Sequence, residues 1–189
     1  ITEGLVGSEM CIRDSVYQEF HHNGEHEQVE ILFEGAQGFG LDVDWGDYPY
    51  VTSSHCTVGG PVLNGVPASA IRKVYGAAKI YETYVGAKEF GMEEGIEAKV
   101  IREYGEEFGA TTGRPRKIDW FDIDSISKAI DINGLTTLVI NKVDVLEKVG
   151  KFILYHGENK FEFDSMSDMQ YYIEEHLKRE GMEIIFSGN

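Results

Sequence analysis

Residues 135 to 142 form an apolar stretch rich in β-branched side chains, Leu-Thr-Thr-Leu-Val-Ile-Asn-Lys, which is typical of a buried strand. A helical pattern precedes it, because Ile123, Ile126 and Ile130 recur at helical spacing. Asn133-Gly134 then supplies a helix stop signal. Similar alternation continues along most of the chain. Strands that alternate with helices predict an α/β fold with a mostly parallel central sheet and flanking helices.

Periodicity and turn residues predict several further elements. Residues 151–164 predict a β-hairpin around Gly157-Glu158-Asn159, and residues 167–181 predict a capped amphipathic helix from Ser167 to Gly181. Gly and Pro punctuate residues 41–67, and loops of this length inside a compact domain tend to be functional. The remaining expectations are a strand over 29–33, a helix and then a strand within 68–86, a helix within 92–109 and a closing strand over 182–186.

The composition narrows the class of protein. The chain has 189 residues and a net charge of −16, from 33 acidic and 17 basic residues. This balance argues against a surface for nucleic acid or for anionic membranes, and no apolar run reaches membrane-spanning length. Two cysteines, Cys11 and Cys56, are too few for a disulfide scaffold and fit a reducing compartment, so the cytoplasm is expected.

The first residues look foreign to the protein. Residues 5–15, "LVGSEMCIRDS", match the translation of a DNA string that resembles a transposase sequencing adapter. We therefore interpret residues 1–15 as an assembly artefact and expect the natural protein to extend upstream of residue 16. Residues 16–189 are then expected to be the C-terminal portion of a single domain.

A nucleotide-reading motif follows the buried strand. Asn141-Lys142-Val143-Asp144, here called the NKVD box, matches the N-K-x-D pattern with which many GTP-binding proteins read guanine. A carboxylate at Asp144 can accept from both N–H groups on the edge of the base, and the Lys142 stem can lie along the ring. The sequence contains no G-x-x-x-x-G-K-[S/T] phosphate loop. Four-residue motifs also occur by chance, so the box alone is a weak signal.

A second stretch is suited to a small anion. Residues 108–117, "FGATTGRPRK", are here called the arginine loop. Gly109 and Gly113 permit close approach of the backbone, two threonines offer hydroxyls, and Arg114 and Arg116 offer forked cations for carboxylate or phosphate. An ordinary solvated basic turn is the alternative. A local basic loop in so acidic a chain favours a site.

Gln37 lies in a glycine turn directly after the first expected strand, where α/β folds bind ligands. Its amide can donate to and accept from a purine edge, and Thr52 can add a hydroxyl contact. From spacing alone, a solvated turn residue is the simpler interpretation of Gln37.

Taken together, these stretches resemble the adenylosuccinate synthetase family. "ILFEGAQG", "DYPYVTSS", "EFGATTGRPRK", "INGLTTLVINKVDVL" and "IIFSG" occur in that family's order and rough spacing. The resemblance covers residues 29 to 188 and corresponds to roughly the C-terminal half of the family. It implies part of a P-loop-GTPase-like fold. The phosphate loop, the catalytic Asp and His and the magnesium ligands are expected in the N-terminal half, so no catalytic or metal-binding residue is assigned here.

The resemblance also implies an activity. The family is a cytoplasmic, homodimeric ligase of purine biosynthesis that joins IMP to L-aspartate, using GTP and Mg²⁺. GTP phosphorylates the 6-oxygen of IMP, and the aspartate amine then displaces phosphate. The complete protein is expected to do this, whereas the chain alone is expected to be inactive and to bind GTP poorly.

Residue roles follow from the same resemblance. IMP is expected at Gln37, Thr52 and Arg114. Guanine is expected at Lys142, Val143 and Asp144, helped by Ser187 and Gly188, with Arg116 reaching toward GTP. The aspartate-binding loop is expected to comprise Ala110, Thr111, Thr112, Gly113, Arg114, Pro115 and Arg116.

Several departures from the family pattern leave alternatives open. Tyr84 stands where the family usually has Arg, His55-Cys56 replace Asn-Thr, and Pro115 interrupts the arginine run. These changes suggest a divergent member, and a viral branch of the family acts on dGMP instead of IMP. A non-catalytic guanine-nucleotide-binding module is the third hypothesis. The intact NKVD box favours GTP as the phosphoryl donor, and hence the IMP enzyme.

Overall fold

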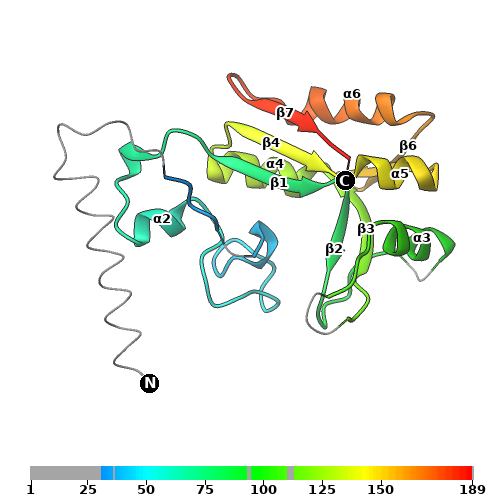
Figure 1. Ribbon diagram of the computed structural model, residues 1–189, viewed down its shortest axis with the longest axis horizontal. Helices are drawn as coiled ribbons and strands as arrows, with labels where there is room; N and C mark the ends of the chain where they lie inside the picture. The colour runs from blue at the N-terminus through cyan, green and yellow to red at the C-terminus, as the bar shows by residue number, and fades with distance from the viewer. Residues whose placement is uncertain (1–30, 36, 93–94, 110–112, 189) are drawn as a thin grey trace. The chain divides into compact units, whose positions relative to one another are not determined.

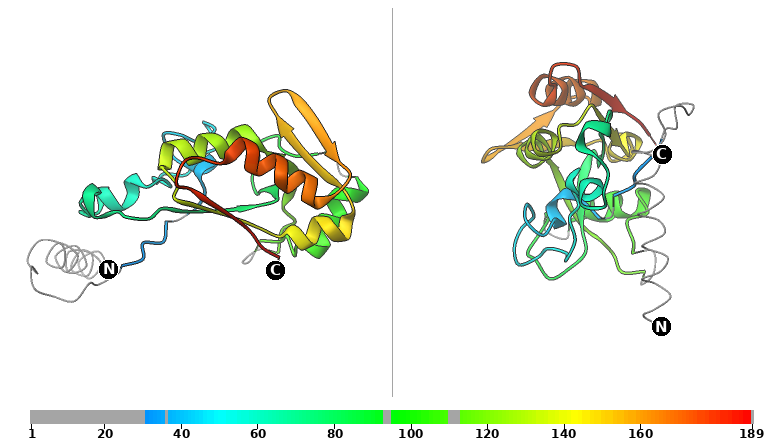
Figure 2. Two further views of the ribbon diagram at one scale, coloured as in Figure 1. Left: turned by 90° about the horizontal axis from the view of Figure 1, so that it is seen from above. Right: turned by 90° about the vertical axis from the view of Figure 1, so that its left-hand side faces the viewer.

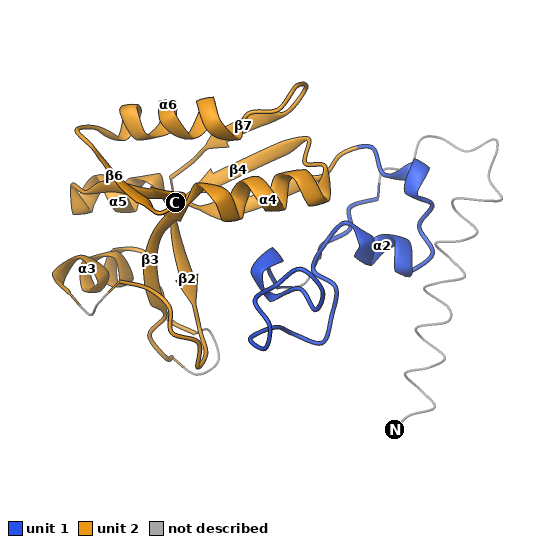
Figure 3. Cartoon of the chain, turned by 180° about the vertical axis from the view of Figure 1, so that it is seen from behind, with its two compact units in different colours: residues 1–72 blue, residues 73–189 orange. Residues whose placement is uncertain are grey.

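A computed structural model of the chain describes residues 31–188, except 36, 93–94 and 110–112. The chain forms two compact units, Ile1–Arg72 and Lys73–Asn189, which are described separately (Figure 3). The assignment of residues 1–15 to an artefact lies outside the described residues. It and the assignment of residues 16–189 to one domain stay predictions.

A three-stranded parallel sheet forms the first layer of the second unit (Figure 1). Its order is β1 (Tyr75–Lys79), β4 (Thr137–Asn141) and β7 (Glu183–Phe186). The central strand β4 buries Leu138 and Ile140, as expected for a strand covered on both faces. The predicted parallel sheet, the buried strand before the NKVD box and the closing strand are therefore confirmed.

A second sheet lies in the same unit and was not predicted. Its four strands run in the order β2 (Tyr81–Tyr84), β3 (Lys117–Asp122), β5 (Phe152–His156) and β6 (Asn159–Phe163). Only the β3–β5 pair is parallel, and the other two pairs are antiparallel. The β5–β6 pair is the predicted hairpin, with Gly157 at φ 61° in its turn.

Four helices cover these sheets: α3 (Ile96–Tyr104), α4 (Ile123–Asn133), α5 (Val143–Val149) and α6 (Met166–Leu177). The predicted stop of α4 is confirmed, because Gly134 takes a left-handed φ of 59° there. Helix α6 begins earlier than predicted, because the hydroxyl of Ser165, not Ser167, accepts from Asp168 N. It ends before Lys178 rather than at Gly181. Helices α4 and α6 run side by side and both contact β5 (Figure 2).

The core of the second unit joins both sheets to the helices. Its largest fully buried side chains include Tyr81, Phe121, Ile140, Leu146 and Leu154. Each such side chain contributes about 1.5–3 kcal/mol when it is removed from water. This core fixes the ends of β4 and β7, from which the NKVD box and Ser187 emerge.

The first unit consists mainly of loops. Its described helical turns are η1 (Phe39–Leu41), α2 (Gly59–Leu63) and η2 (Ala68–Ala70). Within this unit the Asp42 side chain is fully buried, whereas the Tyr48 side chain is 86% exposed. The expected long loop over 41–67 is therefore present, interrupted by α2. In the described part of the chain, no helix combines the length and hydropathy that crossing a membrane requires.

Two further sequence predictions were wrong. Residues 31–33 of the expected strand 29–33 are exposed and carry no strand, since no described strand forms ladder hydrogen bonds with them. The helix expected at the start of 68–86 is only the single turn η2, and β1 and β2 follow. Pairing of β1 with β4 outweighs helix propensity there.

Candidate functional site

The NKVD box lies at the carboxyl end of strand β4, where parallel sheets bind ligands. Lys142 adopts a left-handed φ of 65° that turns the chain from the strand into α5. Val143 N donates to Ser187 O at 3.2 Å, and Ser187 N donates to Ile140 O at 2.9 Å. A Cβ built on Gly188 would lie 3.5 Å from Asp144 Oδ1. The structure therefore brings together Lys142, Val143, Asp144, Ser187 and Gly188.

Two side-chain acceptors in this box lack a donor. Asp144 Oδ1 and Asn141 Oδ1 are buried and have no hydrogen-bond partner among the described residues. The other oxygen of Asp144, Oδ2, accepts from Lys148 Nζ at 3.2 Å. An unpaired buried acceptor costs about 1–3 kcal/mol, so such atoms are rare without a reason. Asp144 Oδ1 is thus available to a ligand's N–H group.

A polar cluster around Glu107 lies beside the box. Glu107, which is only 2% exposed, accepts from Lys79 Nζ at 2.7 and 2.6 Å and from the Tyr81 hydroxyl at 2.8 Å. Its Oε2 lies 3.4 Å from Arg116 Nη1. Lys142 Nζ donates to Gly105 O at 3.3 Å. The cluster therefore contains an arginine and a lysine of the predicted site.

Burial and charge shift the pKa values in this cluster. Desolvation lowers the pKa of Lys79; Glu107 opposes the shift, and the cations of Arg116 and Lys142 add to it. Burial, followed by the hydrogen bond to Glu107, raises the pKa of Tyr81. Glu107 thus faces Lys79 and Arg116, and the charge of Lys142 also acts on Lys79. This surplus of positive charge suits an anionic ligand.

The two described ends of the arginine loop pair with each other in the second unit. Phe108 and Pro115 form an isolated antiparallel bridge, and Gly109 N donates to Arg114 O at 2.8 Å. Gly113 takes a φ of 62°, which favours glycine. Arg102 Nε, from α3, donates to Arg116 O at 2.9 Å. The predicted residues Ala110, Thr111 and Thr112 lie outside the described residues.

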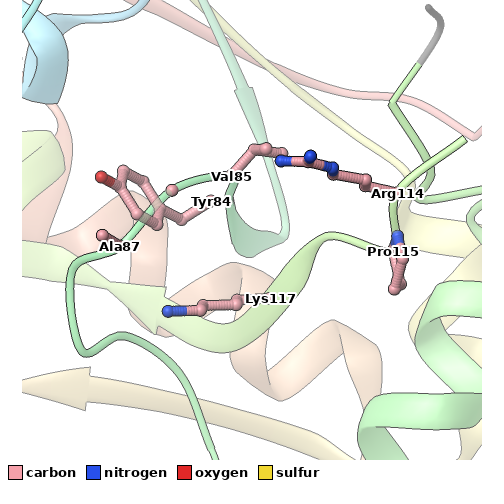
Figure 4. A pocket seen from close by; sticks show the side chains of 7 residues that line it. Tyr84, Val85, Ala87, Arg114, Pro115 and Lys117 are labelled. Atoms are coloured by element: carbon pink, nitrogen blue, oxygen red, sulfur yellow. The ribbon is translucent and has the colours of Figure 1, made fainter. Parts of the chain in front are cut away.

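A pocket of about 400 Å³ opens beside this loop. Arg114 reaches across it toward Val85, while Tyr84 and Ala87 lie at the other end and Lys117 lies nearby (Figure 4). Gly86 and Pro115 complete the lining. Tyr84 packs its ring against Phe90 with centroids 5.4 Å apart. The pocket joins the loop containing Arg114 to the end of β2.

Gln37 and Thr52 belong to the first unit. Gln37 is exposed and adopts a left-handed φ of 67°, which is unusual for a residue other than glycine. Thr52 N donates to Leu41 O at 2.8 Å. Arg114 belongs to the second unit, and each unit is described by itself, so the expectation that Gln37, Thr52 and Arg114 share one ligand stays a prediction.

One group in the first unit has potential metal ligands, namely Asp42, Asp44 and His55. Asp42 already accepts from Asp44 N at 2.9 Å, Trp45 N at 3.0 Å and Cys56 N at 2.5 Å. His55 Nδ1 lies 3.4 Å from Asp44 Oδ2. Mg²⁺ prefers oxygen ligands, whereas this set includes a histidine nitrogen and a carboxylate that backbone N–H groups already occupy. The group fits a brace for the loop rather than a magnesium site.

Asp42→Ala is expected to loosen this loop, because three backbone N–H groups lose their acceptor, at a cost of about 3 kcal/mol. Amide hydrogen exchange at Asp44, Trp45 and Cys56 measures the effect. Asp44→Ala is the matched control, because the Asp44 side chain is 66% exposed. Exchange that is equally slow in both variants would contradict the brace.

The brace also predicts a pH dependence. Burial pushes the pKa of Asp42 upward, but hydrogen bonds from Cys56, Asp44 and Trp45 outweigh it and hold this pKa below its ordinary 3.8. A pKa lowered by folding stabilises the loop above the unfolded value, and this contribution is lost as the pH falls through the folded value. Exchange at the same three amides should therefore accelerate below about pH 4, less so in Asp42→Asn.

Comparisons with known proteins identify the family of the chain. A profile of the adenylosuccinate synthetase family matches residues 9–183. The chain belongs to the adenylosuccinate synthetase family. The adenylosuccinate synthetase of Deinococcus radiodurans is 48% identical over 124 residues, covering 62% of this chain and 31% of the relative. That of Thermus thermophilus is 50% identical over 123 residues, covering 64% of this chain and 30% of the relative.

A solved structure agrees. The fully ligated adenylosuccinate synthetase of Plasmodium falciparum matches with a TM-score of 0.78 at 27% identity, over 92% of this chain and 50% of that one. This match confirms the α/β fold expected for the family. The chain spans about a third of the length of the curated relatives it matches, since the shares are 31% and 30%.

The family to which the chain belongs is a family of ligases. Sequence reasoning missed Lys79, Tyr81 and Glu107 as parts of the site. The one signal for them was the presence of a lysine and a glutamate beside otherwise apolar stretches, "AAKIY" and "GEEFG". That signal is common on solvated surfaces, so it indicates a site only once the structure shows that the three side chains are in contact.

Proposed function

We propose that the protein containing this chain joins IMP to L-aspartate in a GTP-dependent reaction that yields adenylosuccinate. The observation that carries the proposal is the buried, unpaired Asp144 Oδ1 beside Gly188 at the end of a parallel strand. Guanine presents two N–H groups on one edge, and a carboxylate can accept both. Adenine offers no such pair, so this position selects GTP.

The neighbouring groups fit the same base. Lys142 is held by Gly105 O with its stem beside the box, where it can cover the plane of the ring. Val143 and Ser187 are joined through their backbones, and Gly188 places no side chain against the carboxylate. These contacts support a role for all five residues in binding GTP.

The arginine loop supplies the anion-binding part. We assign the aspartate carboxylates to the segment from Ala110 to Arg116, with Arg114 also near IMP and Arg116 directed toward GTP. Forked guanidinium groups bind carboxylate and phosphate through paired hydrogen bonds. The local surplus of positive charge around Glu107 supports this assignment, because phosphoryl transfer requires charge neutralisation.

The remaining assignments rest on the family. IMP is assigned to Gln37 and Thr52 in addition to Arg114. We assign Mg²⁺ to the complete protein as a cofactor, but not to the Asp42 group, whose carboxylate already accepts three backbone N–H groups. We also infer that the complete protein is a cytoplasmic homodimer.

A ligation assay tests the proposal. A hybrid protein is made in which residues 31–189 follow the N-terminal portion of the Deinococcus radiodurans synthetase. That synthetase is 48% identical to this chain over the matched region. We expect adenylosuccinate to form from IMP, L-aspartate and GTP, and not with ATP in place of GTP. Preference for dGMP over IMP would instead identify the viral type of substrate. A folded hybrid that binds GTP without ligation would favour the non-catalytic module.

Gly188→Ala provides a local test of the guanine site. A built Cβ makes no contact closer than 3.5 Å, so the fold tolerates it. The methyl group nevertheless lies over Asp144 Oδ1, which the base must reach. We expect guanine-nucleotide affinity to fall about tenfold, equivalent to 1.4 kcal/mol, with an unchanged melting temperature. Gly60→Ala, in α2, is the control for handling and folding, because a built Cβ there comes no closer than 3.7 Å to another atom. Unchanged affinity in Gly188→Ala would place the base elsewhere.

A further inference from the structure

Glu107 is a buried charge with an unusual set of neighbours. Its carboxylate is 2% exposed and receives a lysine, a tyrosine and an arginine from three different segments. Removing one member of such a buried network leaves the others uncompensated, so it fixes their positions strongly. None of the roles proposed above requires Glu107 to contact a ligand.

The backbone around Glu107 holds both parts of the proposed site. Glu107 O accepts from Arg116 N at 2.9 Å, which anchors the end of the arginine loop. Two residues earlier, Gly105 O accepts from Lys142 Nζ at 3.3 Å, which anchors the NKVD box. The turn Gly105–Glu107 therefore contacts both motifs, although they are far apart in sequence.

This turn is tightly determined. Glu106 between the two anchors has a left-handed φ of 54°, which non-glycine residues rarely adopt. A Cβ on Gly105 would clash with the Tyr81 hydroxyl, so glycine is required where the turn passes the Glu107 cluster. A movement of Gly105 would accordingly displace Tyr81 and Glu107.

Arg116 is the weakest member of the cluster. Its contact to Glu107 measures 3.4 Å, whereas the lysine and tyrosine contacts are 2.6–2.8 Å. Arg116 Nε is buried and has no hydrogen-bond partner among the described residues. The guanidinium is thus held by Glu107 with one donor left over, and a small shift of Glu107 alters its orientation.

We propose that Glu107 is a positioning residue that couples the NKVD box to the arginine loop. When guanine engages Lys142, the tether to Gly105 changes, and Glu107 passes this change to Arg116. The described end of the arginine loop, Gly113–Arg116, then responds to occupancy of the guanine site before its own ligand binds. This inference rests on the proposed function, because it assumes that the box binds guanine.

The first experiment needs no nucleotide. Lys142→Met removes the tether to Gly105, and the Arg116 Nε–Hε signal is followed by NMR in the full chain. We expect the signal to shift in the natural background and to stay in place in Glu107→Gln, where the charged link is lost. Glu103→Gln, an exposed glutamate of α3, is the matched control and should keep the response. The coupling would be overturned if Lys142→Met left the Arg116 signal in place, or if it shifted that signal equally in the Glu107→Gln background.

The second experiment adds GDP to the same proteins. We expect the amides of the box and of Gly113–Arg116 to shift in the natural chain, and only those of the box to shift in Glu107→Gln. Loss of shifts at the box in the natural chain would contradict the proposed function, while the first experiment still decides the coupling. If Glu107→Gln fails to fold, Tyr81→Phe removes one donor to Glu107 and should weaken the transmitted shift without abolishing it. A full-sized loop response in Tyr81→Phe would count against the relay.

Discussion

In the hybrid synthetase, Asp144→Asn is expected to lower the affinity for GDP roughly 30- to 700-fold, which corresponds to about 2–4 kcal/mol. The carboxylate can accept both N–H groups of guanine. An amide offers only one acceptor and turns its own NH₂ toward the second donor of the base. The buried position of Asp144 Oδ1 makes this mismatch costly, because water cannot replace the lost acceptor there.

The same substitution predicts a change of preference. Xanthine has a carbonyl where guanine has its amino group, so the new amide can donate to it. We therefore expect Asp144→Asn to bind xanthosine diphosphate more tightly than GDP. NMR titration measures both affinities, and Asp164→Asn, an exposed aspartate after β6, is the control. A variant that retains GDP binding and the original base preference would show that Asp144 does not read the base.

Phe121→Ala is expected to destabilise the second unit by about 3–5 kcal/mol. Phe121 is fully buried on β3, the strand that joins the antiparallel pair with β2 to the parallel pair with β5. Loss of the ring leaves a cavity between the second sheet and its helices. For a unit of this size, we expect the melting temperature to fall by roughly 10–20 °C.

Thermal unfolding followed by circular dichroism measures this effect. Tyr171→Ala is the matched control, because Tyr171 is 66% exposed on α6 and its loss should change stability by less than about 0.5 kcal/mol. Equal melting temperatures for the two variants would mean that the second sheet is not part of a cooperative core. The second sheet would then not hold the end of the arginine loop in place.

Local signals were sufficient for the parallel sheet. The β-branched run before Asn141 and the glycine at 134 encode a strand and a helix stop within a few residues. The hairpin at Gly157 is likewise a short-range feature. By contrast, the second sheet depends on pairing of β2 with β3 across more than thirty residues, which no local pattern encodes.

The site was predictable to a similar extent. The NKVD box and the arginine loop are contiguous motifs, so their residue types indicate their chemistry directly. The importance of Glu107 depends on Lys79, which is 28 residues away in sequence and meets it only in the folded chain. Ser165 shows the same limit on a small scale, because geometry decides which of two neighbouring serines caps α6.

Nucleotide titration of the ¹⁵N-labelled chain tests the central claim most directly. We predict that GDP binds weakly and shifts the amides of Lys142, Val143, Asp144, Ser187 and Gly188, whereas ADP at the same concentration leaves them in place. Equal responses to GDP and ADP, or guanine-dependent shifts confined to other residues, would contradict the assignment of this edge of the sheet to guanine.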